Sequence, residues 1–440
     1  MRTGWRCLAG VMAVALAASA ARADDWPQWL GPQRDGVWRE KGLLAKFPEK
    51  GPKVVWRAKV ATGYSGPAVA SGKVYVTDFF TEGNTNIDNP MALSDLKGKE
   101  RVLCFDAKSG DQLWKYEYDC HYKISYPNGP RCAPTVHDGK VYTVGAMGDL
   151  YCLDADKGTR VWSKNYGKDY GAKTPLWGFA GHPVVDGRKV ICIVGGPDAV
   201  AVAFDKDTGK ELWKALSAKE PGYSTPALIE AGGKKQVVIW HAQSINGLDA
   251  KTGEKYWSVA LEPQFGMSIM TPRQAGDYLF AGGIGNVAAL VKLAKDKPGA
   301  EVVWRGKKDT AVYPVNSTPF IDDGTLYGVD TESQLRGVKL ETGERLWETM
   351  DATLGDKRGR AGTAFIVKNG DRYLLASETG HLIIAKLTPK GYEEVSRWKM
   401  LEPTSRAFGR DVLWVHPAFA NKCVFWRNDK ELVCASLGTD

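Results

Sequence analysis

The chain has 440 residues, 43% of them hydrophobic and 25% charged, and this globular composition excludes wholesale disorder. Its formal charge of +8 is a weak excess for a chain of this length, so we do not expect nucleic-acid binding. The 16 tryptophans are unusually many, and their spacing carries most of the information in the sequence.

Residues 1–23 have the pattern of a secretory signal peptide. Two arginines precede a short apolar run that ends at a small-x-small cleavage site, Ala21-Arg22-Ala23. No later stretch reaches 18 consecutive apolar residues, so we expect no membrane span. Cys7 precedes the apolar run rather than following it, so we expect no lipid anchor either. We predict a protein exported to a periplasm, or beyond it, as a monomer.

The chain repeats itself with a period near fifty residues. Four segments share the spacing Asp-x3-Gly-x3-Trp, namely FDAKSGDQLW, LDADKGTRVW, FDKDTGKELW and LDAKTGEKYW. A fifth segment, VKLETGERLW, keeps the Gly and the Trp, and degenerate copies extend the series. The repeat tryptophans are Trp56, Trp114, Trp162, Trp213, Trp257, Trp304, Trp347 and Trp398. This period is typical of propellers and solenoids.

Each repeat also predicts four short strands, which we call A to D. Strand A follows a proline and leads through a tight turn into strand B, as in CAPTVHDGKVYTVG and STPFIDDGTLYGVD. Strand C precedes the Asp-Gly turn, and strand D ends near the Trp. We therefore predict an all-β fold, an eight-bladed β-propeller of four-stranded antiparallel blades over residues 51–440, after an N-terminal extension at 24–50.

The two ends of the chain predict how the ring closes. Residues 412–436 supply strands A to C of a last blade, and then the chain stops without a Trp. Residues 54–60 supply a strand D with no A to C before it. We expect these two segments to share one sheet, which would leave no open edge. A solenoid that does not close is the alternative.

The repeated residues predict structural roles. Trp in strand D can fill the gap between neighbouring blades, and Gly suits a turn position with positive φ. Asp four residues earlier can accept backbone N–H bonds inside that turn. Cys104, Cys152 and Cys434 share one repeat position and predict small buried side chains. For Cys120 and Cys132, a disulfide and two free thiols are equally open.

The repeated A-x-D-x-x-T-G-x-x-x-W pattern resembles the pyrroloquinoline-quinone (PQQ) repeat, or tryptophan-docking, propellers, over about residues 51–440. One branch of that superfamily holds quinoprotein alcohol and sugar dehydrogenases, and another holds BamB-like scaffold subunits of outer-membrane protein assembly. The dehydrogenases carry adjacent cysteines, calcium ligands and often a haem domain, whereas this chain has no adjacent cysteines and no C-x-x-C-H motif. The resemblance therefore implies the fold strongly, and PQQ and calcium only as an alternative.

Loop lengths predict which face of the propeller binds. The D–A and B–C connections share one face and contain nearly all the extra sequence, whereas the A–B and C–D turns on the other face are tight. The long connections and the positions before the strand-A prolines carry aromatic and cationic residues suited to binding. These candidates are Tyr122, Tyr126, Arg131, Tyr170, Trp177, His182, Arg358, Arg360, Arg406, Arg410, Trp414 and His416.

Within this set, His182 and His416 occupy equivalent positions just before a strand-A proline, where we expect a ring of side chains at the channel mouth. The spacing of His and Cys predicts no transition-metal site. Three functions follow as hypotheses: a non-catalytic exported scaffold that binds an envelope protein, a PQQ- and calcium-dependent dehydrogenase, and a propeller that binds a carbohydrate or another small molecule.

Overall fold

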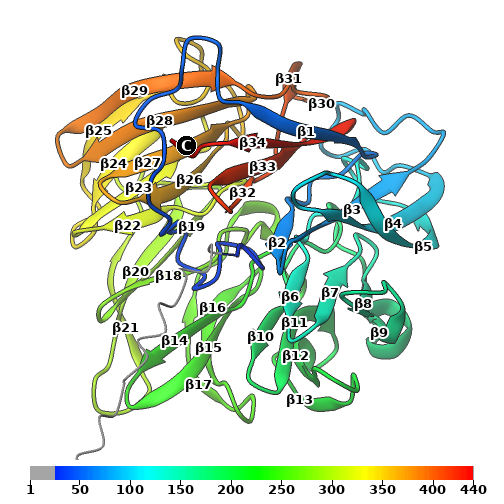
Figure 1. Cartoon of the computed structure of the whole chain (residues 1–440). Helices are drawn as coiled ribbons and strands as arrows, with labels where there is room; N and C mark the ends of the chain where they lie inside the picture. The colour runs from blue at the N-terminus through cyan, green and yellow to red at the C-terminus, as the bar shows by residue number, and fades with distance from the viewer. Residues whose placement is uncertain (1–24, 440) are drawn as a thin grey trace, which may run out of the picture.

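The computed structural model describes residues 25–439, so the predicted signal peptide lies outside the described residues (Figure 1). Eight four-stranded antiparallel sheets form the blades of a ring, as the repeat period predicts. Helix is confined, within the described residues, to α1 (Tyr166–Tyr170) and the 3-10 turn η1 (Gln264–Gly266). No helix among residues 25–439 has both the length and the apolar character needed to cross a membrane.

The first four blades follow one another along the chain. Blade 1 contains β2 (Ala68–Ala70), β3 (Lys73–Phe80), β4 (Leu96–Asp106) and β5 (Gln112–Tyr122). Blade 2 contains β6 (Thr135–His137), β7 (Lys140–Val144), β8 (Asp149–Asp154) and β9 (Arg160–Asn165). Blade 3 contains β10 (Val184–Asp186), β11 (Lys189–Gly196), β12 (Ala199–Asp205) and β13 (Glu211–Ala215). Blade 4 contains β14 (Ala227–Ala231), β15 (Lys234–Trp240), β16 (Ser244–Asp249) and β17 (Lys255–Ala260).

The remaining blades continue the same order. Blade 5 contains β18 (Arg273–Ala275), β19 (Tyr278–Gly283), β20 (Val287–Leu293) and β21 (Ala300–Arg305). Blade 6 contains β22 (Phe320–Asp322), β23 (Thr325–Val329), β24 (Leu335–Lys339) and β25 (Arg345–Thr349). Blade 7 contains β26 (Ala364–Asn369), β27 (Arg372–Ser377), β28 (His381–Thr388) and β29 (Gly391–Lys399). A hairpin of β30 (Ser405–Ala407) and β31 (Arg410–Val412) precedes blade 8.

Blade 8 confirms the predicted closure. Its sheet order is β1 (Val54–Lys59), β34 (Glu431–Ser436), β33 (Cys423–Arg427) and β32 (Ala418–Ala420). Trp56 on the first strand of the chain lies opposite Cys434 on the last. The innermost strands β32 and β6 both contact β2, so the ring is continuous across the two ends of the chain. Blade 8 is therefore complete, with four strands like every other blade.

The Asp-Gly-Trp motif joins neighbouring blades. The indole Nε1–H of Trp56 donates to the carbonyl of Ala107 in blade 1, at 3.0 Å, and the ring lies over Gly110. A Cβ at Gly110 would lie 2.6 Å from that ring, so the motif glycine makes room for the Trp as well as adopting φ +77°. The Asp106 carboxylate accepts the backbone N–H groups of the turn, as predicted.

Residues 25–50 form a leader that crosses the face of the A–B turns. Its backbone pairs with blade 1 through Trp26 and Val69, and with blade 7 through Val37 and Lys368. Near its end, Leu43 pairs with Gly438 beside blade 8. The leader therefore spans the channel on the side opposite the long loops, which the sequence analysis described only as an extension. We call these two sides the turn face and the loop face.

Candidate functional site

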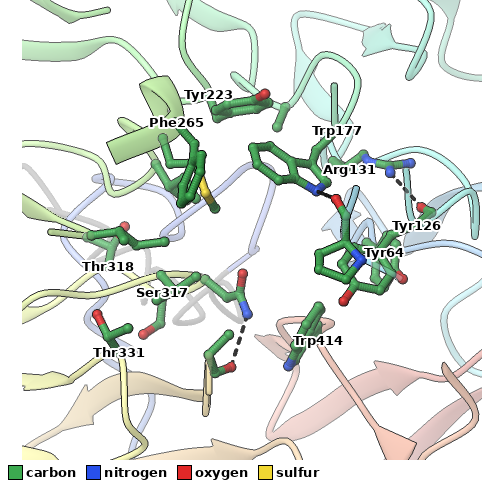
Figure 2. Close-up of a pocket in the computed structure, with 18 of the residues that line it drawn as sticks. Tyr64, Tyr126, Arg131, Trp177, Tyr223, Phe265, Ser317, Thr318, Thr331 and Trp414 are labelled. Atoms are coloured by element: carbon green, nitrogen blue, oxygen red, sulfur yellow. Dashed lines mark hydrogen bonds between the residues drawn. The ribbon is translucent and has the colours of Figure 1, made fainter. Parts of the chain in front are cut away.

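The D–A and B–C connections surround a chamber of about 660 Å³ on the loop face. Connections from every blade junction contribute to it, so the chamber lies on the axis of the ring. Its aromatic lining residues are Trp29, Tyr64, Tyr126, Trp177, Tyr223, Phe265, Phe365, Phe408 and Trp414. Figure 2 shows several of these side chains facing one another across the opening. The volume is that of a typical ligand pocket, about 300–1,000 Å³.

Trp29 of the leader forms the floor of the chamber. Its ring stacks on His182 with centroids 4.8 Å apart and meets the edge of His416 at 4.5 Å. Its Nε1–H donates to Thr271 Oγ1 at 2.9 Å. The same side chain lines a smaller hollow on the turn face, so the indole separates the two spaces. The chamber is therefore accessible from the loop face and blind at its base.

The residues before the strand-A prolines surround this floor, and several of them are hydrogen-bonded to a neighbour. The Ala133 N–H donates to His182 Nδ1 at 2.8 Å, and the His182 N–H donates to Thr225 Oγ1 at 3.2 Å. The Thr271 N–H donates to Thr318 Oγ1 at 3.0 Å. We expected this ring at the channel mouth, and the structure places it beside Trp29 at the base instead. The long loops extend beyond strand A and build the walls above it.

Both histidines beside the floor are buried, and burial favours their neutral form. Desolvation lowers the pKa of His416 to about 4, and desolvation together with the nearby His416 lowers the pKa of His182 well below its ordinary value. His182 accepts at Nδ1, which assigns its proton to Nε2. Gly66 makes room for His416, since a Cβ there would lie 2.3 Å from the imidazole. These groups support the floor structurally.

The chamber walls present aromatic faces on one side, from Trp177 and Trp414, and polar side chains on the other, from Ser317 and Thr331. The Trp177 Nε1–H donates to the Pro90 carbonyl at 3.0 Å, as the dashed line in Figure 2 indicates. The Trp414 Nε1–H donates to the Glu378 carboxylate at 3.1 Å. Because the polar edges of both indoles are engaged by the protein, the rings offer apolar surface to an occupant.

Three aromatic residues of the chamber have a left-handed backbone, which is uncommon for bulky side chains. The φ angles are 48° at Tyr126, 58° at Phe265 and 52° at Phe408. Within residues 25–439, no other aromatic residue has a positive φ. Phe265 is 63% exposed and Phe408 is 37% exposed, and Met91, which also lines the chamber, is 58% exposed. The rim therefore combines backbone strain with exposed apolar surface, two features that folding alone does not favour.

Charge in the chamber is predominantly positive. The Arg131 guanidinium donates to the carbonyls of Gly129, Ser125 and Tyr126 and lies over the Tyr64 ring at 5.3 Å. Among residues 25–439, no carboxylate forms an ion pair with Arg131 or with Arg360. The lining carboxylate is Glu332, which pairs with Arg358 at 3.3 Å.

The structure brings seven of the twelve predicted binding residues together in the chamber: Tyr126, Arg131, Trp177, His182, Arg360, Trp414 and His416. Arg358 and Arg406 are exposed beside the chamber and pair with Glu332 and Asp88. Arg410 lies behind the wall and binds Glu378 at 2.7 Å.

Two predicted residues lie elsewhere. Tyr122 is completely buried, stacks on Phe79 and donates to Glu100, whose pKa is raised by burial. Tyr170 in α1 donates to Glu211 at 2.9 Å, away from the axis. Tyr122 ends strand β5 and faces the interior of blade 1, whereas Tyr170 at the end of α1 packs on Phe204 of blade 3.

Sequence reasoning missed several lining residues, chiefly Trp29, Tyr64, Tyr223, Phe265 and Phe408. Tyr64 and Tyr223 share a signal, since each stands three residues before a strand-A proline in a Gly-Tyr-Ser-x-Pro-Ala segment, whereas Phe265 and Phe408 match no repeated pattern. The sequence could have pointed to Trp29, because this Trp lies in the leader, outside every repeat, and therefore has no docking position between blades.

The disulfide considered between Cys120 and Cys132 does not form. Cys120 and Cys132 are both free. They belong to different hydrophobic clusters, Cys120 beside Phe79 and Cys132 beside Tyr142. Cys104, Cys152 and Cys434 are buried as predicted. Residues 25–439 contain no group of three or more His, Cys, Asp or Glu side chains arranged to hold a metal ion.

Sequence comparison identifies the family. The pattern of the family described as "Outer membrane protein assembly factor BamB" matches residues 98–239 and 241–389, about two thirds of the chain. The chain belongs to the BamB family. BamB of Shewanella oneidensis is 22% identical over 254 residues, covering 55% of this chain and 62% of that protein. The match thus spans less than two thirds of that BamB relative.

Quinoproteins are similar to a comparable degree. Quinohemoprotein alcohol dehydrogenase ADH-IIG of Pseudomonas putida is 25% identical over 357 residues, covering 70% of this chain and 45% of that enzyme. Among solved structures, BamB of Moraxella catarrhalis has a TM-score of 0.56 at 15% identity, covering 88% of this chain and 98% of that one. This structural likeness shows the fold. The function therefore has to be argued from the chamber.

Proposed function

We propose that this protein is a non-catalytic propeller of the cell envelope whose loop face binds a partner protein. Membership of the BamB family supports the envelope location and the binding role. The observation that carries the proposal is the rim of the chamber, where Phe265 and Phe408 are exposed on a left-handed backbone and Met91 adds a further exposed apolar side chain. Exposed apolar patches with a polar surround are typical of interaction sites, and strain persists where binding requires it.

A photo-crosslinking experiment tests the binding face. A photoreactive phenylalanine analogue replaces Phe408 at the rim, and in a control chain it replaces Leu212, which is 42% exposed on the outer strand of blade 3. We expect one discrete cross-linked polypeptide from the Phe408 position in extracts of the source organism, and none from Leu212. Phe265→Asp should abolish that cross-link. Identical products from both positions, or none from the rim, would contradict the proposal.

The dehydrogenase relatives raise PQQ with calcium as a second candidate, and the residues of the chamber do not fit it. Calcium takes about six to eight oxygen ligands, often from several carboxylates. Glu332 is the carboxylate that lines the chamber, and its partner is Arg358. No cysteine pair is adjacent in the chain to stack on a cofactor. We derive no reaction through PQQ.

Titration of the purified protein with PQQ and calcium chloride tests whether it binds this cofactor. We expect neither stoichiometric binding, followed by cofactor absorbance, nor dye-linked oxidation of ethanol or glucose. Tight binding accompanied by turnover would replace the scaffold proposal with a dehydrogenase.

A carbohydrate ligand is the other hypothesis. Sugar sites need accessible hydrogen-bonding groups beside aromatic rings. Here the Trp177 and Trp414 N–H groups are already bound within the protein, and the polar side chains of Ser317 and Thr331 lie on the opposite side of the chamber. An array of neutral and acidic glycans should therefore give no specific binding, and a single strongly bound glycan would favour this hypothesis instead.

A further inference from the structure

We propose that the chamber is an anchor pocket for one aromatic side chain of the partner polypeptide, flanked in the partner by acidic residues. This inference rests on the proposed function and names the chemistry that the loop face would recognise. Four features of the chamber support it: the closed floor, the walls, the rim and the charge.

The blind floor restricts how an occupant enters. Trp29, held between His182 and His416, closes the base of the chamber, so a chain cannot thread through the ring. Entry is from the loop face alone, as a side chain, a loop tip or a chain end. The space of about 660 Å³ is larger than one aromatic ring and accommodates the backbone on either side of it.

The walls favour an apolar ring. Trp177 and Trp414 present carbon faces because their N–H groups are engaged elsewhere, and Phe265 lies across the opening from them (Figure 2). Offset and edge-to-face packing against such rings favours an aromatic side chain. A polyhydroxylated occupant would find polar partners on the side of Ser317 and Thr331, but would lose hydrogen bonds to water against the two indole faces.

The rim favours a polypeptide over an isolated small molecule. Met91 and Leu93 belong to the long B–C connection of blade 1 and are 58% and 62% exposed. Leu93 does not line the chamber, so the exposed apolar surface continues beyond the space that a small ligand would fill. A polypeptide anchored in the chamber would cover that surface with its flanking residues.

The arginines that line the chamber favour acidic residues on either side of the inserted ring. Arg360 at the rim has no carboxylate partner among residues 25–439, whereas the Arg131 guanidinium is bound to backbone carbonyls and Glu332 is paired with Arg358. A carboxylate beside an inserted ring could pair with Arg360, and the charge of Arg131 in the wall would add to the attraction.

Binding of short peptides to the purified full chain tests the inference. The probe is a blocked heptapeptide, Gly-Ser-Asp-Phe-Asp-Ser-Gly, compared with versions in which Ala replaces Phe or Lys replaces both Asp. Calorimetry should give a dissociation constant at least ten-fold lower for the Asp-Phe-Asp peptide than for either control, and the affinity should fall as salt rises. Equal affinities, or no binding at millimolar peptide, would overturn the inference.

Two variants of the protein separate the charge from the ring contacts. Arg360→Glu should weaken the Asp-Phe-Asp peptide at least ten-fold, whereas Lys357→Glu in the same loop, outside the chamber, should leave it unchanged. Phe265→Gly should weaken binding without lowering the unfolding midpoint. An unaffected Arg360→Glu protein, or one weakened no more than Lys357→Glu, would contradict the acidic flank.

The two proposals fail separately. Phenylpropionate binding more tightly than the peptide would show a small-molecule site and overturn the polypeptide occupant. If a partner cross-links at Phe408 but no peptide distinguishes Phe from Ala, the anchor inference fails while the binding face stands. If the peptide binds but nothing cross-links, the chamber chemistry stands and the scaffold proposal fails.

Discussion

At the scale of single residues, the chamber concentrates conformations that cost stability. Left-handed backbone at a non-glycine residue costs about 1–2 kcal/mol, and Tyr126, Phe265 and Phe408 each adopt it. Burial of the Tyr126 ring offsets part of this cost, whereas the Phe265 ring offsets little of it because it is largely exposed. At Phe265, folding would favour a residue without this strain, whereas the proposed binding role requires the exposed ring.

Replacing Phe265 with glycine should be neutral or stabilising. The substitution relieves about 1–2 kcal/mol of backbone strain and adds about 0.5–1 kcal/mol of chain entropy to the unfolded state. We expect the free energy of unfolding in urea to stay constant or rise by up to about 1 kcal/mol. Val303→Gly on β21, with a comparably exposed side chain on a regular strand, should lose about 1 kcal/mol instead. A clear loss of stability in Phe265→Gly would mean that the ring supports the fold.

His416 should make the protein sensitive to acid. Its folded pKa of about 4 lies below the unfolded value of about 6.5, so the unfolded state binds more protons between these limits. The stability associated with neutral His416 is complete above pH 6.5 and decreases as pH falls towards 4, by about 3 kcal/mol.

The variant His416→Thr, which has the residue found before Pro226, Pro272 and Pro319, should lose less stability than the native protein over this pH range. Urea unfolding at pH 7, 5.5 and 4 measures the difference. Parallel loss in both proteins would show that His416 is not responsible.

At the scale of elements, the outer strand of one blade is joined to the next blade by its Trp. The indole N–H of Trp162 donates to the Lys206 carbonyl at 3.0 Å, and its ring packs on Gly209. The ring of Trp213 packs on Gly253 in the same way, but its Nε1 is buried without a partner among the described residues. The two sites thus share the packing and differ in the hydrogen bond.

Substitutions at Trp162 and Trp213 separate the contribution of ring packing to stability from that of the hydrogen bond. Trp213→Ala should cost about 3–5 kcal/mol of unfolding free energy, because it removes a large ring from between two blades. Trp162→Phe should cost about 1 kcal/mol more than Trp213→Phe, because only Trp162 loses a hydrogen bond, while the Lys206 carbonyl keeps the Tyr142 hydroxyl as a donor. Denaturant titration of the variants measures both. Loss of partner binding in Trp213→Ala at unchanged stability would instead assign the docking Trp a functional role.

At the scale of the whole molecule, β1 connects the first and last parts of the chain. It pairs with β34 from Val54 to Lys59, so blade 8 depends on residues separated by more than 370 positions. Loop-closure entropy grows slowly with length, so one sheet can hold such distant ends together.

Deleting residues 51–60 should therefore destabilise the entire ring. Blade 8 would lose its outer strand and its Trp, and would expose an unpaired edge. We expect a large fall in the thermal midpoint and a loss of cooperativity. Deleting residues 82–91, an equal length from the B–C connection of blade 1, should have a much smaller effect because that segment contains no strand. An unchanged midpoint in the 51–60 deletion would contradict the closure.

The sequence determined the architecture because its information is local and repeated. The spacing of Asp106, Gly110 and Trp114 recurs along the chain, and each copy predicts a tight turn, a strand and a contact with the next blade. The closure followed from the same pattern, since an isolated strand D at one end complements an incomplete blade at the other. The choice of loop face followed from loop length, which also needs no tertiary information.

Only the tertiary structure decided what occupies the axis of the ring. Trp29 reaches the floor because the leader crosses the turn face and inserts one ring between His182 and His416, residues 153 and 387 positions away. Phe265 and Phe408 reach the rim through turns whose left-handed backbone no propensity favours for aromatic residues. Repeats encode what all blades share, whereas the chamber is built from what each loop does differently, so its composition depends on contacts that no periodic signal contains.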